Sequence, residues 1–203
     1  MISFEDIQLY LPKYLAPESQ RELFDGLRQF PDNIDERFYT KALIEEETIF
    51  QGDGIKDLLF INLPDSFIGK KLGMILSNTC DISLENRRLN PINIIYAPII
   101  KLKSFISLMI EEKIELTSSL ADYVNSIKKQ YITQLFYLPK SELIEESIVF
   151  LDKINSCENN YIDRTNLKNL RFFSLSNYGL YVLLVKLSIH FMRLNEKVDR
   201  TAC

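Results

Sequence analysis

Residues 48–64 read TIFQGDGIKDLLFINLP, and at this stretch the chain changes from a helical to a strand-rich pattern. The triplet Gly52-Asp53-Gly54 is a turn signal, a strand-like run follows it, and Pro64 ends the run. Two more apolar runs come next, KKLGMILSNTCDIS at 70–83 and PINIIYAPII at 91–100. Continuous β-branched runs are typical of strands that are buried on both faces or that line a small barrel. The stretch therefore predicts that a β core begins here.

Further segments extend this β core toward the C-terminus. Residues 131–139 (YITQLFYLP) and 146–154 (ESIVFLDKI) are strand candidates, and NLRFFSLS at 169–176 is a candidate for the last strand. Between the two groups of strands, residues 101–130 have apolar side chains at helical spacing. This spacing predicts a helical insertion within the β core.

Helices are predicted at both ends of the chain. Pro17 begins a short amphipathic helix that Pro31 ends, and a second helical piece is expected over residues 36–46. Ser176 is a candidate N-cap for a long, mostly apolar helix. We therefore predict one α+β domain over residues 1–203. Its parts are a helical N-terminal part (1–47), a β core (48–100 and 131–175), a helical insertion (101–130) and a C-terminal helix (176–200).

The composition argues against several classes of protein. The 203 residues are 46% hydrophobic and 26% charged, and the net charge of −4 disfavours nonspecific binding to nucleic acid. The chain has only 6 glycines and neither a Walker A nor a dinucleotide motif, so no cofactor is expected. One histidine and scattered carboxylates make no metal-ligand set. Three unpaired cysteines and the lack of a signal-peptide pattern predict a cytoplasmic protein without a membrane segment.

Short motifs in residues 51–100 resemble the core of the PemK/MazF-type small SH3-like barrel proteins, a bacterial toxin family. The motifs are Gly52-Asp53, Ile75-Leu76-Ser77 and Ala97-Pro98-Ile99. The resemblance implies a small SH3-like β-barrel core and a toxin–antitoxin or phage-defence setting. Many members of that family are endoribonucleases with an Arg-Pro pair before the second strand. This chain has Lys70-Lys71-Leu72 there, which argues against RNA cleavage.

The string LSNTCDIS at residues 76–83 contains the first candidates for catalysis. A nucleophilic Cys80 would need a base, and the single histidine of the chain is His190. Cys80, His190 and one acid, Asp81 or Asp53, are therefore the candidate catalytic set. In the alternative interpretation Cys80 is a small hydrophobic residue that closes a buried strand.

The polar residues of the same string have two interpretations. They can hydrogen-bond the backbone where a strand ends at the rim of the barrel. Alternatively, they form a recognition patch together with the loop that follows them. The residues of that candidate patch are Ser77, Asn78, Thr79, Asp81, Arg87 and Arg88.

Basic or titratable residues recur along the C-terminal helix at intervals of three and four, which places them on one stripe. The stripe is either the solvent face of the helix or a basic rail for phosphate or an acidic partner. From Arg164 onward, seven basic residues oppose two acidic ones, which is compatible with an acidic partner or with the acidic front half of this chain. The stripe consists of Lys186, His190, Arg193, Lys197 and Arg200.

Taken together, these patterns favour a noncatalytic bacterial binding module. A protein partner is expected, nucleic acid is possible through the basic C-terminal helix, and the apolar excess of that helix is compatible with a homodimer. The rival interpretation is an enzyme, either a divergent endoribonuclease or a Cys80-dependent hydrolase.

Overall fold

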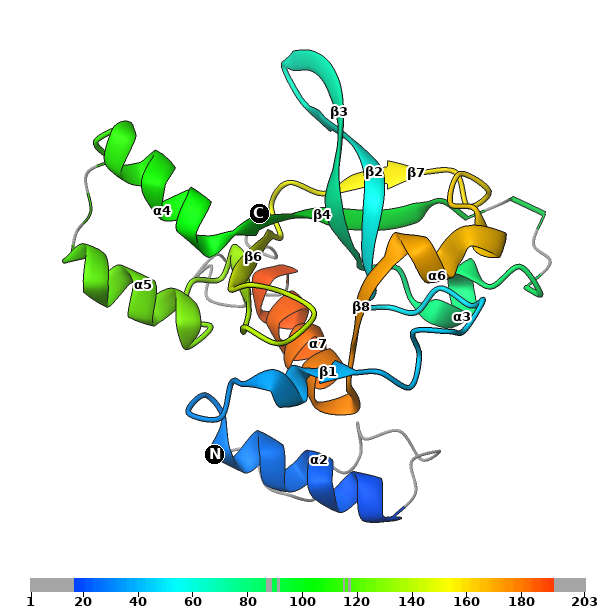
Figure 1. Ribbon diagram of the computed structural model, residues 1–203, viewed down its shortest axis with the longest axis horizontal. Coiled ribbons are helices and arrows are strands. Elements are labelled where there is room, and N and C mark those ends of the chain that lie inside the picture. The colour runs from blue at the N-terminus through cyan, green and yellow to red at the C-terminus, as the bar shows by residue number, and fades with distance from the viewer. Residues whose placement is uncertain (1–16, 87–88, 91, 115, 117, 192–203) are drawn as a thin grey trace, which may run out of the picture.

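A computed structural model describes residues 17–86, 89–90, 92–114, 116 and 118–191 of the chain (Figure 1). Its centre is a curled antiparallel sheet, with helices around it. Within the described residues this sheet has eight strands, seven of which follow the order β1-β8-β2-β3-β4-β6-β5, while β7 pairs with β4. The strands are β1 (Tyr39–Thr40), β2 (Gly54–Asn62), β3 (Asp65–Ile75), β4 (Ile94–Lys101), β5 (Leu135–Leu138), β6 (Ser147–Phe150), β7 (Asn155–Cys157) and β8 (Arg171–Leu175).

Six α-helices and two short 3-10 turns lie within the described residues. The first helix begins at Pro17 as predicted and ends two residues before Pro31. None of these helices combines the length and the apolar character that crossing a bilayer requires. The helices are α2 (Pro17–Gln29), α3 (Thr79–Ile82), α4 (Leu102–Glu111), α5 (Leu120–Lys128), α6 (Leu167–Leu170) and α7 (Asn177–Phe191), and the 3-10 turns are Glu36–Phe38 and Arg164–Asn166.

The α+β class agrees with the prediction, but the closed SH3-like barrel was wrong. The sheet is open, with β1 and β5 at its two ends, and these strands do not pair in the part of the chain that the structure describes. Side chains at or beside the two ends bring them into contact. Phe38 and Phe136 stack with ring centroids 6.1 Å apart, and the Tyr39 hydroxyl donates to the Pro139 carbonyl at 2.7 Å. Because strands of a curled open sheet are also buried on both faces, apolar runs cannot distinguish it from a barrel.

The helix expected over residues 36–46 was also wrong. Only a 3-10 turn forms at 36–38, and Tyr39 and Thr40 then pair with β8. The guanidinium of Arg171 donates to the carbonyls of Leu43, Ile44 and Glu46 at 2.5, 3.1 and 2.7 Å. Those carbonyls are therefore held by a distant side chain instead of by a local helix.

A buried ion pair organises this end of the sheet. Arg171 Nε lies 3.0 Å from Asp53 Oδ2, and both side chains are fully buried. Asp53 also accepts hydrogen bonds from the Ser174 hydroxyl at 2.6 Å and from the Phe50 amide at 2.9 Å. The turn predicted at residues 52–54 thus carries a carboxylate, and both of its oxygens accept hydrogen bonds from neighbouring groups. We therefore assign Asp53 a structural role.

Three hydrophobic clusters make up the core. The largest joins β3, β4, β5, β6 and β8 to α2 and α7, with Phe136, Phe173 and Leu183 among its fully buried members. The second lies under β2, β3 and β4 and includes Tyr96. The third packs α4 and α5 against β5 and β6. The tip of the β2–β3 hairpin projects away from the rest of the sheet (Figure 1), and Ile61, Leu63 and Ile68 belong to none of the three clusters.

Candidate functional site

The polar residues of LSNTCDIS mostly bond to the backbone. The Ser77 hydroxyl accepts from the Ile95 amide at 2.7 Å, and Asn78 Oδ1 accepts from the Cys80 amide at 2.9 Å, which caps α3. The Thr79 hydroxyl accepts from the Gln51 amide at 3.0 Å. These contacts support the structural interpretation of the three residues, since each side chain already holds a backbone group.

The candidate catalytic set is not assembled by any described contact. Cys80 lies exposed on α3, and Asp81, next to it, takes part in an interaction of its own. His190 lies at the C-terminal end of α7, with its ring against that of Phe191. Among the described residues no hydrogen bond joins Cys80 to His190. Likewise, no group of three His, Cys, Asp or Glu side chains within the described ranges is placed to hold a metal ion.

The basic stripe of α7 is interrupted at Lys186. This side chain is only 4% exposed, and its amine donates to the Gln130 carbonyl at 2.5 Å. Burial lowers the pKa of Lys186 from 10.5 to about 8. Lys186 therefore belongs neither to a solvent face nor to a surface rail, and its place in the predicted stripe was wrong. The remaining basic candidates, Arg87, Arg88, Arg193, Lys197 and Arg200, lie outside the described residues.

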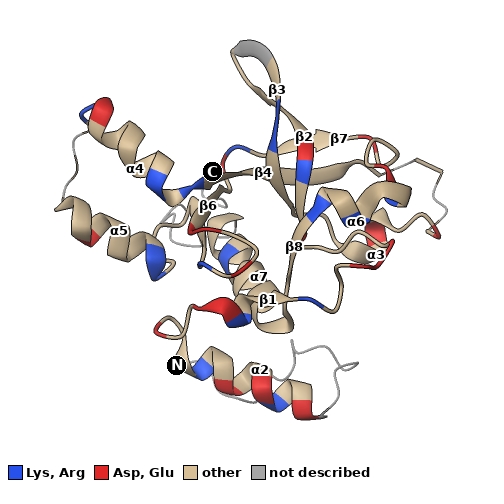
Figure 2. Cartoon of the chain, in the orientation of Figure 1, with Lys and Arg blue, Asp and Glu red and all other residues tan. Residues whose placement is uncertain are grey.

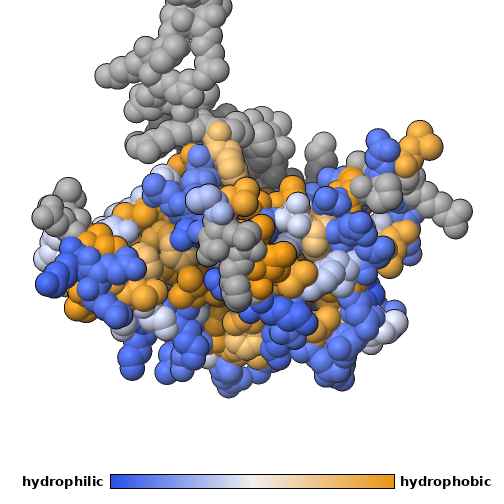
Figure 3. Space-filling view, turned by 90° about the horizontal axis from the view of Figure 1, so that it is seen from above, coloured by the Kyte–Doolittle hydropathy of each residue, from blue (hydrophilic) through white to orange (hydrophobic). Residues whose placement is uncertain are grey.

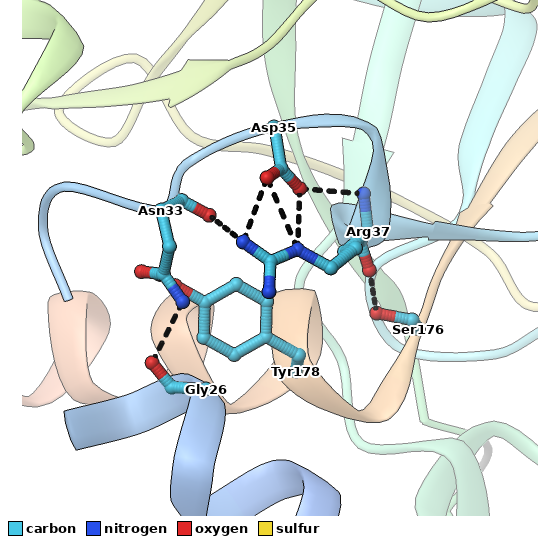
Figure 4. Close-up of polar contacts among 6 residues, drawn as sticks. All are labelled: Gly26, Asn33, Asp35, Arg37, Ser176 and Tyr178. Atoms are coloured by element: carbon cyan, nitrogen blue, oxygen red, sulfur yellow. Dashed lines mark hydrogen bonds and ion pairs between the residues drawn. The ribbon is translucent and has the colours of Figure 1, made fainter. Parts of the chain in front are cut away.

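A second polar cluster joins α2 to the start of α7 (Figure 4). Asn33 Nδ2 donates to the Gly26 carbonyl at 2.8 Å, and the Tyr178 hydroxyl donates to Asn33 Oδ1 at 2.6 Å. The Ser176 hydroxyl accepts from the Gly179 amide at 3.2 Å, so the predicted N-cap is confirmed. These bonds fix the angle between the two helices.

An ion pair between Arg37 and Asp35 completes this cluster. Its guanidinium makes a two-pronged pair with Asp35, in which Nη2 lies 2.7 Å from Oδ2 and Nε lies 2.8 Å from Oδ1. The Arg37 side chain holds the pKa of Asp35 below its usual value. A cavity of about 300 Å³ lies beside Arg37, Ser176 and Tyr178. Because the polar groups of this cluster bond to one another, we assign it a structural role.

The outer half of the β2–β3 hairpin is different, because it exposes apolar side chains. We call residues 58–72 the arm; Leu58 and Phe60 at its inner end still belong to the second hydrophobic cluster, and the residues beyond them leave it. Ile61, Leu63 and Ile68 are 40%, 77% and 58% exposed, and Ile61 lies directly opposite Ile68 across the hairpin. Figure 3 looks at the molecule from the side of the arm and shows hydrophobic residues gathered near the middle of this face, with hydrophilic residues around it. The arm therefore presents an apolar surface that no described part of the chain covers completely.

A cavity of about 340 Å³ lies where the arm leaves the sheet. Leu72 of β3, Ile99 of β4 and Phe172 of β8 contribute apolar walls, and residues 141–145 form the opposite side. Lys101 lies at this cavity and pairs with Glu145 at 2.8 Å. We take the arm and this cavity as the candidate functional site.

Sequence reasoning identified the strands of this site but missed its exposed residues. Residues 55–62 were predicted as a strand-like run that Pro64 ends, and nothing in an Ile or Leu distinguishes a buried position from an exposed one. In the structure both strands of the hairpin are longer than the usual length of about 5–6 residues, with 9 residues in β2 and 11 in β3, and β3 begins at Asp65, before the run predicted from residue 70.

A scan against models of known protein families finds no match for this chain, and no curated protein matches it significantly. The resemblance of residues 51–100 to the PemK/MazF-type proteins therefore stays a prediction. The site must be interpreted from its own geometry.

Proposed function

We propose that this protein is a noncatalytic interaction module and that a protein partner binds to its arm. The observation that carries this proposal is the exposure of Ile61, Leu63 and Ile68 on an extension that leaves the hydrophobic core. Exposed apolar surface of this kind is typical of protein-interaction sites. The resemblance of residues 51–100 makes a bacterial toxin–antitoxin or phage-defence assembly the first place to search for the partner.

Two features favour binding at the arm over the alternatives. The side chains of Ser77, Asn78 and Thr79 hold backbone groups, so they are not free to form a recognition patch. Lys186 is buried, so it does not contribute to a basic surface for nucleic acid. The arm combines accessibility with apolar character, which a protein interface requires at its centre.

Site-specific photo-crosslinking in the source cells tests the proposal. A photoreactive amino acid is placed at Leu63 on the arm, and a matched control is placed at Leu84, which is 65% exposed and lies outside the arm. We expect a defined crosslinked protein from position 63 and not from position 84. A product formed equally from both positions would contradict the proposal.

The crosslinked protein is then purified and its affinity for this chain is measured by calorimetry. The double variant Ile61→Thr/Ile68→Thr is expected to weaken binding at least tenfold, whereas Leu84→Thr is expected to bind like the wild type. Unchanged affinity of the double variant would overturn binding through the arm.

A further inference from the structure

Along the arm, β3 has one free edge. On one side β3 pairs with β2, and on the other side β4 pairs only with residues 73–75. In the part of the chain that the structure describes, no strand continues beyond Gly73 on that second side. An unpaired edge of this kind presents backbone donors and acceptors to which an incoming strand can add.

The hydrogen-bond pattern shows which residues face the free edge. Both the amide and the carbonyl of Ile75 bond to the backbone of residues 52–53 at 2.8 Å, so Ile75 faces the β2 side. Alternate residues of an antiparallel strand face opposite edges. The backbone groups of Leu72, Lys70 and Ile68 are therefore directed to the free edge.

Contacts of the neighbouring strand agree with this assignment. The Ile61 amide donates to Asn155 Oδ1 at 2.9 Å, and the Leu59 carbonyl accepts from the Tyr96 hydroxyl at 2.5 Å. Both groups therefore point away from β3. Leu59 and Ile61 lie opposite Lys70 and Ile68, so the backbone groups of these two β3 residues also point away from the hairpin interior.

The free edge leads into the cavity at the base of the arm. Leu72 is both the last residue of the free edge and a wall of that cavity, together with Ile99 and Phe172. A strand that follows the edge from the tip toward β4 would reach this cavity with its final side chain. The cavity is thus placed to take one apolar side chain of such a strand.

The charges along the free edge favour an acidic strand. Lys70 and Lys71 are exposed on β3, and Figure 2 shows a blue segment of basic residues on this strand. At the cavity, Lys101 holds the pKa of Glu145 below its usual value, and Lys103 and Lys140 act in the same direction. Glu142 also lines the cavity and pairs with Lys41 at 2.8 Å, so the charges at the cavity largely offset one another, and the excess of positive charge beside the edge comes from Lys70 and Lys71.

From these observations we infer that the partner contributes an extended acidic segment, which adds as a strand to the edge of β3 and inserts an apolar side chain beside Leu72. This inference rests on the function proposed above. A second copy of this chain fits the edge less well, because two antiparallel β3 edges would bring Lys70 near its own symmetry mate. Nucleic acid fits less well because Ile61, Leu63 and Ile68, the exposed side chains near the tip, offer no ring on which a base can stack.

A peptide selection against the full chain tests the chemistry of the segment. The probes are displayed random peptides of about ten residues, the length that can follow the arm. We expect selected peptides to alternate Asp or Glu with Val, Ile or Leu, and their affinity to fall as salt rises. Selection of basic peptides or of no consensus, or displacement of a selected peptide by single-stranded RNA, would overturn the inference.

Two substitutions at Lys70 test whether the segment adds as a strand. Lys70→Pro removes both the charge and an amide that faces the free edge, without touching an amide that pairs with β2. Lys70→Gln removes only the charge. The best selected peptide, followed by fluorescence anisotropy, is expected to bind about tenfold more weakly to Lys70→Pro than to Lys70→Gln, since a backbone hydrogen bond is lost. Equal affinities of two variants that melt like the wild type would overturn strand addition.

The outcomes separate this inference from the proposed function. If Ile61→Thr/Ile68→Thr abolishes binding of the crosslinked partner while Lys70→Pro and Lys70→Gln both leave it intact, strand addition is wrong and binding through the arm stands. If the Ile61→Thr/Ile68→Thr variant binds the partner normally, the proposed function is wrong, and the inference that rests on it is wrong as well.

Discussion

The base and the outer arm of the β2–β3 hairpin belong to the same two strands, yet they differ in what surrounds them. At the base, Asp53, directly before β2, and Arg171, on the neighbouring strand β8, are fully buried and each bonds to several groups. In the arm, Ile61 and Ile68 face each other and remain exposed. The difference shows that a charged group can be structural and an apolar group available for binding, because the surroundings of a side chain decide its role.

The largest expected effect is at the base. Arg171→Met removes the partner of a buried carboxylate and the donor to the carbonyls of residues 43–48, so we expect a loss of about 3–5 kcal/mol in the free energy of unfolding. Urea denaturation measures the change. A loss below about 1 kcal/mol would mean that the base is no more constrained than the arm.

Lys186 is a second buried basic group to compare with Arg171. Its described hydrogen bond goes to a carbonyl and not to a carboxylate. Its pKa is lowered to about 8, from 10.5, so the unfolded chain holds this proton more tightly than the folded chain. The free energy of unfolding should therefore rise with pH between about 8 and 10, by up to about 1.4 kcal/mol per pH unit. Below pH 8 both states are protonated and this contribution to the slope disappears.

The matched variant is Lys186→Met, which keeps an unbranched side chain one atom shorter and removes the titrating group. Denaturation of both proteins is measured across this pH range. The free energy of unfolding of the wild type, relative to that of Lys186→Met, should rise with pH by the slope given above. Parallel pH profiles would show that the amine of Lys186 is not desolvated in solution.

A substitution that crowds the packing at the base is expected to have an intermediate effect on the free energy of unfolding. A Cβ added at Gly54 would lie 2.4 Å from the Phe173 ring, a distance that requires the ring to move. We expect Gly54→Ala to lower the free energy of unfolding by about 1–3 kcal/mol. A thermal melt detects the change, and a neutral result would mean that the ring has free space beside it.

The smallest expected effect is in the arm. Ile61→Thr and Ile68→Thr remove exposed apolar atoms, so each should change the free energy of unfolding by no more than about 0.5 kcal/mol. A larger loss would show that the arm packs against another part of the protein and is not a free binding surface.

Much of the secondary structure could be predicted from local patterns. The turn at 52–54, the apolar runs that became β3 to β6 and β8, the helix that begins at Pro17 and the N-cap Ser176 all depend on neighbouring residues. The predicted helix at 36–46 failed because the carbonyls there bond to Arg171, which is more than a hundred residues away. The stripe on α7 failed for the same kind of reason, since Lys186 turns inward toward Gln130.

By itself the sequence determined the α+β class and the positions of most strands, because period, turn residues and caps act over a few residues. Only the tertiary structure decided that the sheet stays open, that Asp53 is sealed by Arg171, and that Ile61 and Ile68 lie outside the core. These properties depend on which distant segments come together, and an isoleucine or an aspartate has the same local pattern whether it is covered or not.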